Sequence, residues 1–225
     1  MIAAKFVILI LVGYLIGSIP IGILVARRQA KVDLRQFGSG KIGATNVLRT
    51  VGRKAALLVA LLDILKGAVA VFFAGFLVGH EYLIIGELGL GARAAQVLAA
   101  LAAMTGHIWS VFLGFQGGRG VSTFFGGLAA LCPVAALFGG EALIIGAGLS
   151  RYASLGSIIG TVGTYTILVP LTLLNGFPIE YLIYALVGTI MVIAKHRDNI
   201  ARLLAGKERR LDEKVVAKGA KSPHG

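Results

Sequence analysis

Long apolar runs recur along most of this 225-residue chain, and they constrain its fold more than any other feature. A helix needs roughly 20 mostly apolar residues to cross the hydrocarbon core of a bilayer, which is about 30 Å thick. Hydrophobic residues make up 57% of the chain and charged residues 14%, well outside the usual balance of a soluble domain. Because backbone polar groups in lipid must be satisfied within their own segment, the runs predict helices. We therefore expect an all-α integral membrane protein.

Seven apolar segments are candidate transmembrane helices, and two of them are weak. They are residues 6–26, 55–78, 94–115, 121–131, 133–149, 154–174 and 179–194. The first is too long for the apolar core of an ordinary signal peptide and lacks a cleavage pattern, so we interpret it as a retained span. Segment 121–131 is too short to cross alone as a straight helix, and Pro133 separates it from the next. We predict about seven spans, one or two of them short or broken, with five spans and a re-entrant pair as the alternative.

The distribution of basic residues predicts the orientation of the chain, because Lys and Arg near span ends are retained in the cytoplasm. Segment 27–54 carries eight of them against one acidic residue, and the chain after Ala194 carries nine, whereas residues 80–93 are net acidic. We expect the N-terminus outside and the C-terminus in the cytoplasm. Residues 1–206 are the predicted membrane domain, and 207–225 a basic, partly disordered tail. Since the charges lie beside apolar runs, the net charge of +12 favours membrane anchoring and an anionic ligand over nucleic acid.

A glycine-rich polar segment on the predicted cytoplasmic side has the composition of a phosphate loop. Its glycines let backbone N–H groups converge on an anion, its neutral side chains add hydrogen bonds, and its cations add charge. The glycines are Gly38, Gly40 and Gly43, the neutral side chains are Ser39, Thr45 and Asn46, and the cations are Lys41 and Arg49. The spacing differs from a Walker A loop, so nucleotide hydrolysis is not implied. The alternative is a solvated loop at the membrane edge, with Asn46 as a helix cap.

A second polar segment lies farther along the chain, where Gly106 and His107 are followed by a glycine-rich turn at 115–123. The turn leads into an apolar helix, whose first N–H groups and dipole favour phosphate, and Arg119 adds a planar, bidentate donor. The candidate binding residues are His107, Gly117, Gly118, Arg119, Gly120 and Thr123. Glycines that only allow close packing of membrane helices are the alternative.

The third polar segment follows the last span. His196 and Asn199 are three residues apart and share a face on a helix. A His side chain can hold a phosphate as a cation or take a proton as a base. Ser154 and Ser157, in and after a short internal loop, are further candidates for the same site, with helix capping as the alternative.

One pair of charged residues falls inside a predicted span. Asp63 and Lys66 are three residues apart in segment 55–78. Ions in a membrane interior are costly, so a functional role or mutual pairing is the default. We interpret the two as a structural ion pair near the active face.

Taken in order, the three polar segments resemble the cytoplasmic motifs of the bacterial acyl-phosphate:glycerol-3-phosphate acyltransferase family, PlsY, over about the first 210 residues. The family's first motif is Gly-Ser-Gly-Asn-x-Gly-Ala-Thr-Asn with a following Arg, and Lys41 stands here where the family has the Asn before x. Its second motif pairs Gly-His with Phe-Lys-Gly-Gly-Lys-Gly-Val-Ala-Thr. Here Gln116 and Arg119 replace the two lysines, and Ser110 replaces a usual proline. The third motif, His-Arg-x-Asn-Ile and then Leu-Leu-x-Gly-x-Glu, is met as far as Glu208.

The resemblance implies transfer of a fatty acyl group from acyl phosphate to the sn-1 hydroxyl of glycerol 3-phosphate, forming lysophosphatidic acid. It also implies a bacterial cytoplasmic membrane, with the active site facing the cytoplasm. The residues expected to act in catalysis are Ser39, Arg49, His196 and Asn199. The proton acceptor is left open between His196 and a substrate phosphate oxygen. We expect a monomer that contacts its two substrates and membrane lipids, without a metal, an organic cofactor or nucleic acid.

Two rival functions remain from the sequence alone. A transporter would use the same basic loops to bind a phosphorylated molecule or lipid without reacting with it, although the sequence lacks the internal repeat of many transporters. A structural membrane subunit would need the polar loops for assembly only. Release of inorganic phosphate favours the enzyme over both.

The departures from the family motifs generate a testable hypothesis about charge. Lys41 adds a cation where the family has Asn, and Gln116 removes one where the family has Lys, so we hypothesise that the total charge at the phosphate site is conserved by relocation. Lys41→Asn and Gln116→Lys are expected to change the dependence of the acylation rate on glycerol 3-phosphate. The rate is measured with both purified variants at several concentrations of glycerol 3-phosphate. If neither variant differs from the unmodified protein in this dependence, the hypothesis is wrong.

Overall fold

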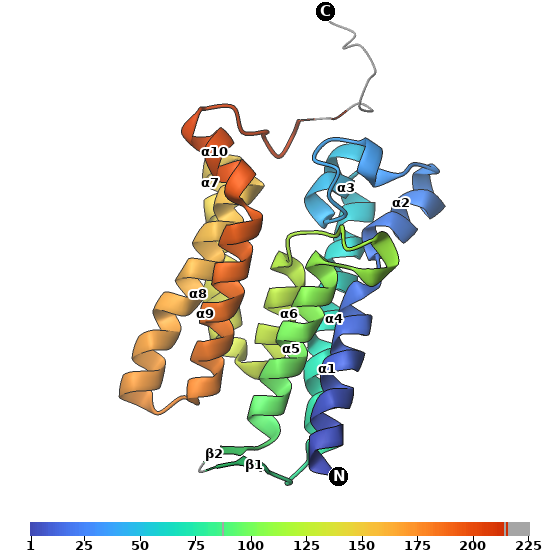
Figure 1. The fold of residues 1–225 in the computed structure, drawn as a ribbon. Helices are drawn as coiled ribbons and strands as arrows, with labels where there is room; N and C mark the ends of the chain where they lie inside the picture. Colours follow the sequence, from blue (N-terminus) through green and yellow to red (C-terminus); the bar gives the residue numbers. More distant parts are fainter. Residues whose placement is uncertain (87, 214, 216–225) are drawn as a thin grey trace, which may run out of the picture.

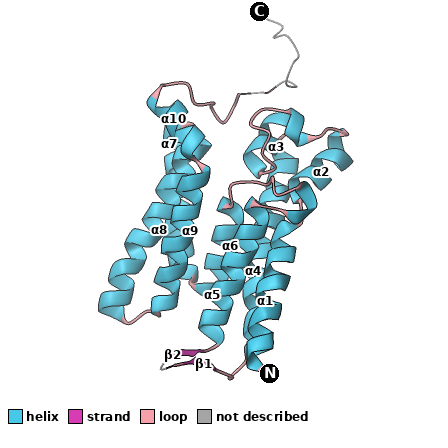
Figure 2. Ribbon diagram, viewed as in Figure 1, coloured by secondary structure: helices cyan, strands magenta, loops and turns pink. Residues whose placement is uncertain are grey.

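The computed structural model describes residues 1–86, 88–213 and 215, which form a mostly helical bundle, as predicted (Figures 1 and 2). Its α-helices are α1 Ile2–Ser18, α2 Ile21–Ala30, α3 Ala44–Thr50, α4 Arg53–Val78, α5 Ala92–Ile108, α6 Val121–Leu131, α7 Pro133–Ser150, α8 Ala153–Asn175, α9 Ile179–Lys195 and α10 Arg197–Leu204. Two short 3-10 helices are η1 Leu34–Gln36 and η2 Val111–Leu113. Strands β1 Leu83–Ile85 and β2 Leu88–Leu90 pair antiparallel between α4 and α5, which the sequence did not predict.

Each predicted span contains at least one helix, but the first is divided between α1 and α2, and the third extends beyond α5 into η2. The helices also differ in their capacity to cross a bilayer. In the described part of the chain, five segments are long and apolar enough, and the pair α9 and α10, bent by 61°, adds a sixth if it is one span. Helix α6 has only 11 residues and ends just before Pro133, as expected for the weak segment. The N-terminus and α10 lie at opposite ends of the bundle (Figure 1). The number of crossings and their orientation stay predictions.

Proline interrupts the first span near the end of the bundle that carries α3 and α10. Ile19 leaves the helical region, with φ −55° and ψ 119°, because the ring of Pro20 disfavours a helical conformation in the preceding residue. The chain resumes as α2, which tilts away from α1 (Figure 1). From α4, the ammonium group of Lys66 donates to the carbonyl oxygen of Ile19 across 3.3 Å. The break therefore supplies a polar partner to a charge that lies within a span.

Helices α5, α6 and α9 form the main hydrophobic core. The rings of Phe124 on α6 and Tyr184 on α9 stack with centroids 5.3 Å apart and planes at 8°. The Tyr184 hydroxyl donates to the Phe124 carbonyl oxygen across 2.9 Å, which satisfies the one polar atom of a fully buried side chain. Gly188 leaves room for the Phe124 ring, since a Cβ at this position would overlap it. Small residues of this kind allow close approach of membrane helices.

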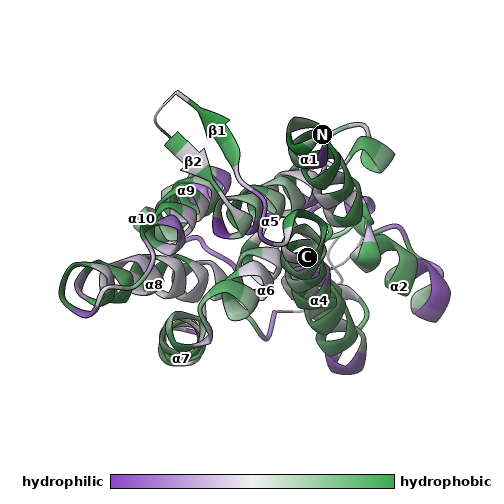
Figure 3. Cartoon of the chain, turned by 90° about the horizontal axis from the view of Figure 1, so that it is seen from below, coloured by the Kyte–Doolittle hydropathy of each residue, from purple (hydrophilic) through white to green (hydrophobic). Residues whose placement is uncertain are grey.

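The outer surface of the bundle is apolar, as a lipid-facing surface must be. Phe76 and Leu149 are 90% and 84% exposed, and many other large hydrophobic side chains are exposed around the helices. Figure 3 shows hydrophobic residues on the helices around the whole bundle when it is viewed along its length. Soluble proteins rarely expose so much contiguous apolar surface. The surface therefore agrees with a membrane location.

The contact between α1 and α5 depends on a glycine. Gly17 is buried, and a Cβ at this position would overlap the backbone carbonyl of Ala103, which is not free to move. Gly17→Ala is therefore expected to lower stability by about 1–3 kcal/mol, as overpacking does. Thermal unfolding in detergent measures the effect. Gly148→Ala is the matched control, because a Cβ there meets no described atom within 4 Å, and equal melting temperatures for the two variants contradict the prediction.

Candidate active site

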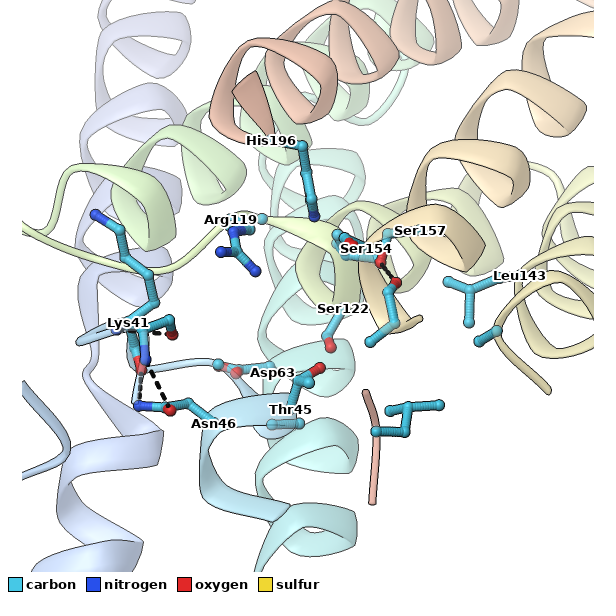
Figure 4. Close-up of a pocket in the computed structure, with 18 of the residues that line it drawn as sticks. Lys41, Thr45, Asn46, Asp63, Arg119, Ser122, Leu143, Ser154, Ser157 and His196 are labelled. Atoms are coloured by element: carbon cyan, nitrogen blue, oxygen red, sulfur yellow. Dashed lines mark hydrogen bonds between the residues drawn. The ribbon is translucent and has the colours of Figure 1, made fainter. Parts of the chain in front are cut away.

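A pocket opens at the end of the bundle that carries α3 and α10, and all three polar segments contribute to it. Its volume is about 250 Å³, slightly below the roughly 300–1,000 Å³ of pockets for drug-sized ligands. The side chains labelled in Figure 4 surround a common space and come from helices and loops that are far apart in the sequence. The predicted site residues that line it are Ser39, Lys41, Gly43, Thr45, Asn46, Arg49, His107, Arg119, Gly120, Ser154, Ser157 and His196.

The first polar segment is held in shape by Asn46. Its amide nitrogen donates to three backbone carbonyl oxygens, those of Leu34, Phe37 and Lys41, at 3.2, 3.2 and 2.9 Å. The alternative in which Asn46 caps a helix is wrong, because Gly43 occupies the cap position of α3 and no side chain caps it. The amide of Asn46 therefore shapes the loop, and its donors are already used within the protein.

Two glycines of this loop act through the backbone only. Gly38 and Gly40 have φ values of 51° and 70°, which few other residues adopt without strain. Neither is among the residues that line the pocket, so they shape the loop that presents Ser39 and Lys41. Lys41 lines the pocket, whereas Gln116, the other departure in the charge hypothesis, is exposed and outside the lining.

The second polar segment presents Arg119 beside the N-terminus of α6. Burial lowers the pKa of Arg119 to about 10, with the charge of Glu208 acting in the opposite direction, so the guanidinium is still a cation at neutral pH. Its Nε atom is buried without a hydrogen-bond partner in the described protein. A buried cation with an unused donor is well suited to an anionic ligand.

The neighbouring glycines do not act as the predicted backbone donors. The N–H groups of Gly117 and Gly118 donate to the carbonyl oxygens of Ile108 and His107, at 3.1 and 3.0 Å. Neither glycine lines the pocket, and neither does Thr123, whose buried hydroxyl belongs to α6. Gly120 does line it, with φ 85° immediately before the helix. The turn therefore supports Arg119 instead of offering a row of free N–H groups.

His196 lies beyond the last residue of α9, at the bend before α10. Its Nδ1 atom is 2.8 Å from the carbonyl oxygen of Val192, which can only accept, so the proton is on Nδ1 and Nε2 is left as an acceptor. Burial, together with the positive charge of Arg119, lowers the pKa of His196 to about 4. The ring is therefore neutral at pH 7. Of the two predicted roles, this favours proton acceptor over phosphate-binding cation.

Glu208 joins three elements beside the pocket. Its carboxylate accepts hydrogen bonds from Ser154 and Asn199 at 2.9 and 2.6 Å and from the Arg202 guanidinium at 2.8 Å. Burial alone would raise the pKa of Glu208, but these three hydrogen bonds lower it overall. Asn199 does not line the pocket; its Oδ1 atom is buried without a partner among the described residues. Asn199 therefore acts first on Glu208, and Ser154 contacts both Glu208 and the pocket.

The chain after α10 continues over the pocket. Arg49 donates through its guanidinium to the carbonyl oxygens of Arg209 and Arg210, at 2.8 and 2.7 Å. The backbone N–H of Leu211 donates to the Arg151 carbonyl at 2.9 Å, and Leu211 lines the pocket. Residues 207–213, predicted as the start of the tail, thus contribute to the site. The rest of the predicted disordered tail, 214 and 216–225, lies outside the described residues.

Two pocket residues with polar side chains were not among the predicted site residues. Ser122 is the second residue of α6, and Asp63 lines the pocket from α4. Asp63 Oδ1 is 2.7 Å from the Lys66 ammonium group, which agrees with the predicted ion pair. The signal that could have marked Asp63 as a site residue is its charge within a span. Within the described chain, no group of three His, Cys, Asp or Glu side chains is placed to hold a metal.

The fold and the pocket define a polytopic membrane protein whose ligand site is cationic and lies at one end of its helices. The glycerol-3-phosphate acyltransferase family matches residues 7–206, and the chain belongs to this family. The family match and the relatives show that the protein is an acyltransferase that acylates glycerol 3-phosphate.

Relatives and solved structures agree over nearly the whole chain. Glycerol-3-phosphate acyltransferase 3 of Dehalococcoides mccartyi (strain CBDB1) is 64% identical over 215 residues, which are 96% of this chain and 100% of the relative. The glycerol-3-phosphate acyltransferase of Thermus thermophilus is 42% identical over 212 residues, 93% and 96% of the two chains. The crystal structure of PlsY, an integral membrane glycerol 3-phosphate acyltransferase, in its glycerol 3-phosphate form, superposes with a TM-score of 0.78. It is 35% identical and covers 91% of this chain and 94% of its own.

The protonation state of His196 can be tested directly. Because its pKa lies near 4, the ring is expected to stay neutral, with the proton on Nδ1, as the pH falls from about 8 to about 5.5. NMR of protein with isotope-labelled imidazoles measures this, and the His196 signals are those lost in His196→Gln. A titration midpoint near 6.5, the ordinary value for His, contradicts the expected state.

Proposed function

We propose that the protein transfers a fatty acyl group from acyl phosphate to the sn-1 hydroxyl of glycerol 3-phosphate, releasing lysophosphatidic acid and inorganic phosphate for phospholipid synthesis. The observation that carries the proposal is the meeting of three cations, Lys41, Arg49 and Arg119, with the neutral His196 in one pocket. Both reactants carry a phosphate group, and a cationic pocket lowers the cost of bringing them together.

The chemical step needs little beyond positioning, because acyl phosphate is an activated donor. The sn-1 oxygen bonds to the carbonyl carbon, the bond from that carbon to the phosphate oxygen breaks, and the phosphate leaves with the electron pair. The hydroxyl proton passes to Nε2 of His196 or to a phosphate oxygen. Ser39 has no base beside it among its described contacts, so direct transfer is preferred to an acylated serine.

The residue roles follow from position and charge. We assign Arg119 and Lys41 to phosphate recognition, with Arg119 as the buried anchor. Ser39 and Arg49 are assigned to the acyl-phosphate end, Arg49 also holding residues 209 and 210 over the pocket. Asn199 is assigned to the same phosphate region through Glu208, because its own amide does not reach the lining.

The pocket also has an apolar wall that suits the fatty chain. Leu143 and Ala147 on α7 line it on one side, and Leu211 lines it from the segment after α10. An acyl tail placed along this wall stays with the hydrocarbon of the bilayer while its phosphate stays with the cations. The pocket therefore offers separate surfaces to the two ends of the donor.

The orientation belongs to the same proposal. The basic segment 27–54 and residues 196–213 lie at the pocket end of the bundle (Figure 1). Because Lys and Arg beside spans are retained in the cytoplasm, we place this end at the cytoplasmic face of the bacterial inner membrane. The protein acts there as a monomer, since one chain supplies every residue that the mechanism uses.

Turnover by the purified protein tests the proposed reaction. With a synthetic acyl phosphate and glycerol 3-phosphate, mass spectrometry is expected to show lysophosphatidic acid and phosphate in equal amounts. Arg119→Gln removes a charge-assisted hydrogen bond worth about 1.5–3 kcal/mol, so KM for glycerol 3-phosphate is expected to rise roughly 10- to 100-fold.

The control for this variant is Arg93→Gln, an exposed arginine at the start of α5, at the opposite end of the bundle. Its KM is expected to match that of the unmodified protein. Turnover with an acyl thioester but not with acyl phosphate contradicts the proposed donor. Uptake of glycerol 3-phosphate into vesicles without any product contradicts the reaction and favours transport.

A further inference from the structure

A buried polar cluster at the pocket has no role in the mechanism proposed above. Asp63 of α4 and His107 of α5 both line the pocket, and they are only 1% and 3% exposed. Asp63 lies ten residues into α4, deeper in the bundle than the start of that helix at the pocket end. Among the described lining residues, Asp63 is the one that carries a carboxylate. A carboxylate among cations serves a different ligand group from the phosphates.

The two side chains have hydrogen-bonding capacity left over. His107 Nδ1 and Asp63 Oδ1 lie 3.5 Å apart, which is long for a hydrogen bond, and His107 Nδ1 has no nearer partner among the described residues. Lys66, which is held by the Ile19 carbonyl, offsets the charge of Asp63 from 2.7 Å. Buried polar atoms are nearly always hydrogen-bonded in a complete structure. The ion pair balances the charge of Asp63 and uses part of the accepting capacity of its carboxylate, which has further lone pairs, while His107 Nδ1 keeps only the long contact to Asp63.

The chemistry of this pair suits a hydroxyl group. A carboxylate accepts a hydrogen bond from a hydroxyl and repels a phosphate, and an imidazole nitrogen bonds the same hydroxyl as donor or acceptor. Glycerol 3-phosphate, the acceptor on which this inference rests, has two hydroxyls. The sn-1 hydroxyl must face the acyl carbonyl, which leaves the hydroxyl on C2 to be recognised elsewhere.

We propose that Asp63 and His107 bind the C2 hydroxyl of glycerol 3-phosphate and so determine acceptor specificity. The substrate is held at two points, its phosphate by Arg119 and Lys41 and its C2 hydroxyl by the deeper pair. This orientation directs the sn-1 hydroxyl toward the donor. A site that hydrogen-bonds a substrate hydroxyl rejects an analogue without it, because its own buried polar groups are then left unpaired.

The test compares two acceptors, glycerol 3-phosphate and 3-hydroxypropyl phosphate, which lacks only the C2 hydroxyl. The unmodified protein is expected to favour glycerol 3-phosphate by about 100-fold or more in kcat/KM. Asp63→Asn is expected to reduce this ratio at least about tenfold, almost entirely through slower acylation of glycerol 3-phosphate. Because it leaves Lys66 buried without its counter-ion, the double variant Asp63→Asn with Lys66→Gln is measured beside it. His107→Gln, which leaves the ion pair intact, is expected to reduce the ratio in the same direction.

The outcomes separate a binding role from a structural one. A structural role lowers the melting temperature and both kcat/KM values together, so an unchanged ratio in any folded variant of Asp63 or His107 overturns the proposal. Equal use of the two acceptors by the unmodified protein also overturns it, even if no variant folds. If the unmodified protein acylates neither acceptor from acyl phosphate, the proposed reaction itself is wrong, which is a different result from a retained ratio.

Discussion

The lack of water in a bilayer core is the constraint on which the rest of this structure depends. A charge that is buried between the spans must find its partners within the protein or in a ligand. Arg49 is hydrogen-bonded to the carbonyl oxygens of Arg209 and Arg210, and Glu208 receives three hydrogen bonds, one from α8 and two from α10. Arg119 retains an unused donor and lines the pocket, where a ligand can reach it. The segment directly after α10 is therefore part of the site, because it supplies partners to Arg49 and Arg202.

The same constraint applies to three interruptions of the helices at the pocket end. Irregular backbone is tolerated at membrane depth only where protein buries it or where it lines a cavity. The break at Pro20, the turn before α6 and the bend at His196 all lie at the pocket end of the bundle (Figure 1). Each break delivers a polar group: the Ile19 carbonyl to Lys66, the Arg119 guanidinium and the His196 ring to the pocket. The interruptions of the helices therefore also place polar groups at the site.

Much of this arrangement was predictable, because its signals are local. Apolar run length marked the spans, and Pro133 marked the break after the short helix α6. The composition of the polar segments marked Ser39, Lys41, Arg119 and His196, which the structure brings to one pocket. The exact partners of backbone groups were not predictable in this way. Gly117 and Gly118 look like free donors in the sequence, but their N–H groups face the end of α5, which lies next to them only in the folded bundle.

The sequence by itself determined that this chain is a helical membrane protein of the acyltransferase family, because apolar length and motif spacing are properties of the chain read in order. Only the tertiary structure decided which polar groups are available to a ligand. In the folded chain Asn199 is hydrogen-bonded to Glu208, Arg49 is hydrogen-bonded to the segment after α10, and Asp63 lies beside His107. It also made His196 neutral, since burial and a neighbouring cation set its pKa. These properties depend on distances between residues far apart in sequence, and such distances exist only once the helices have packed.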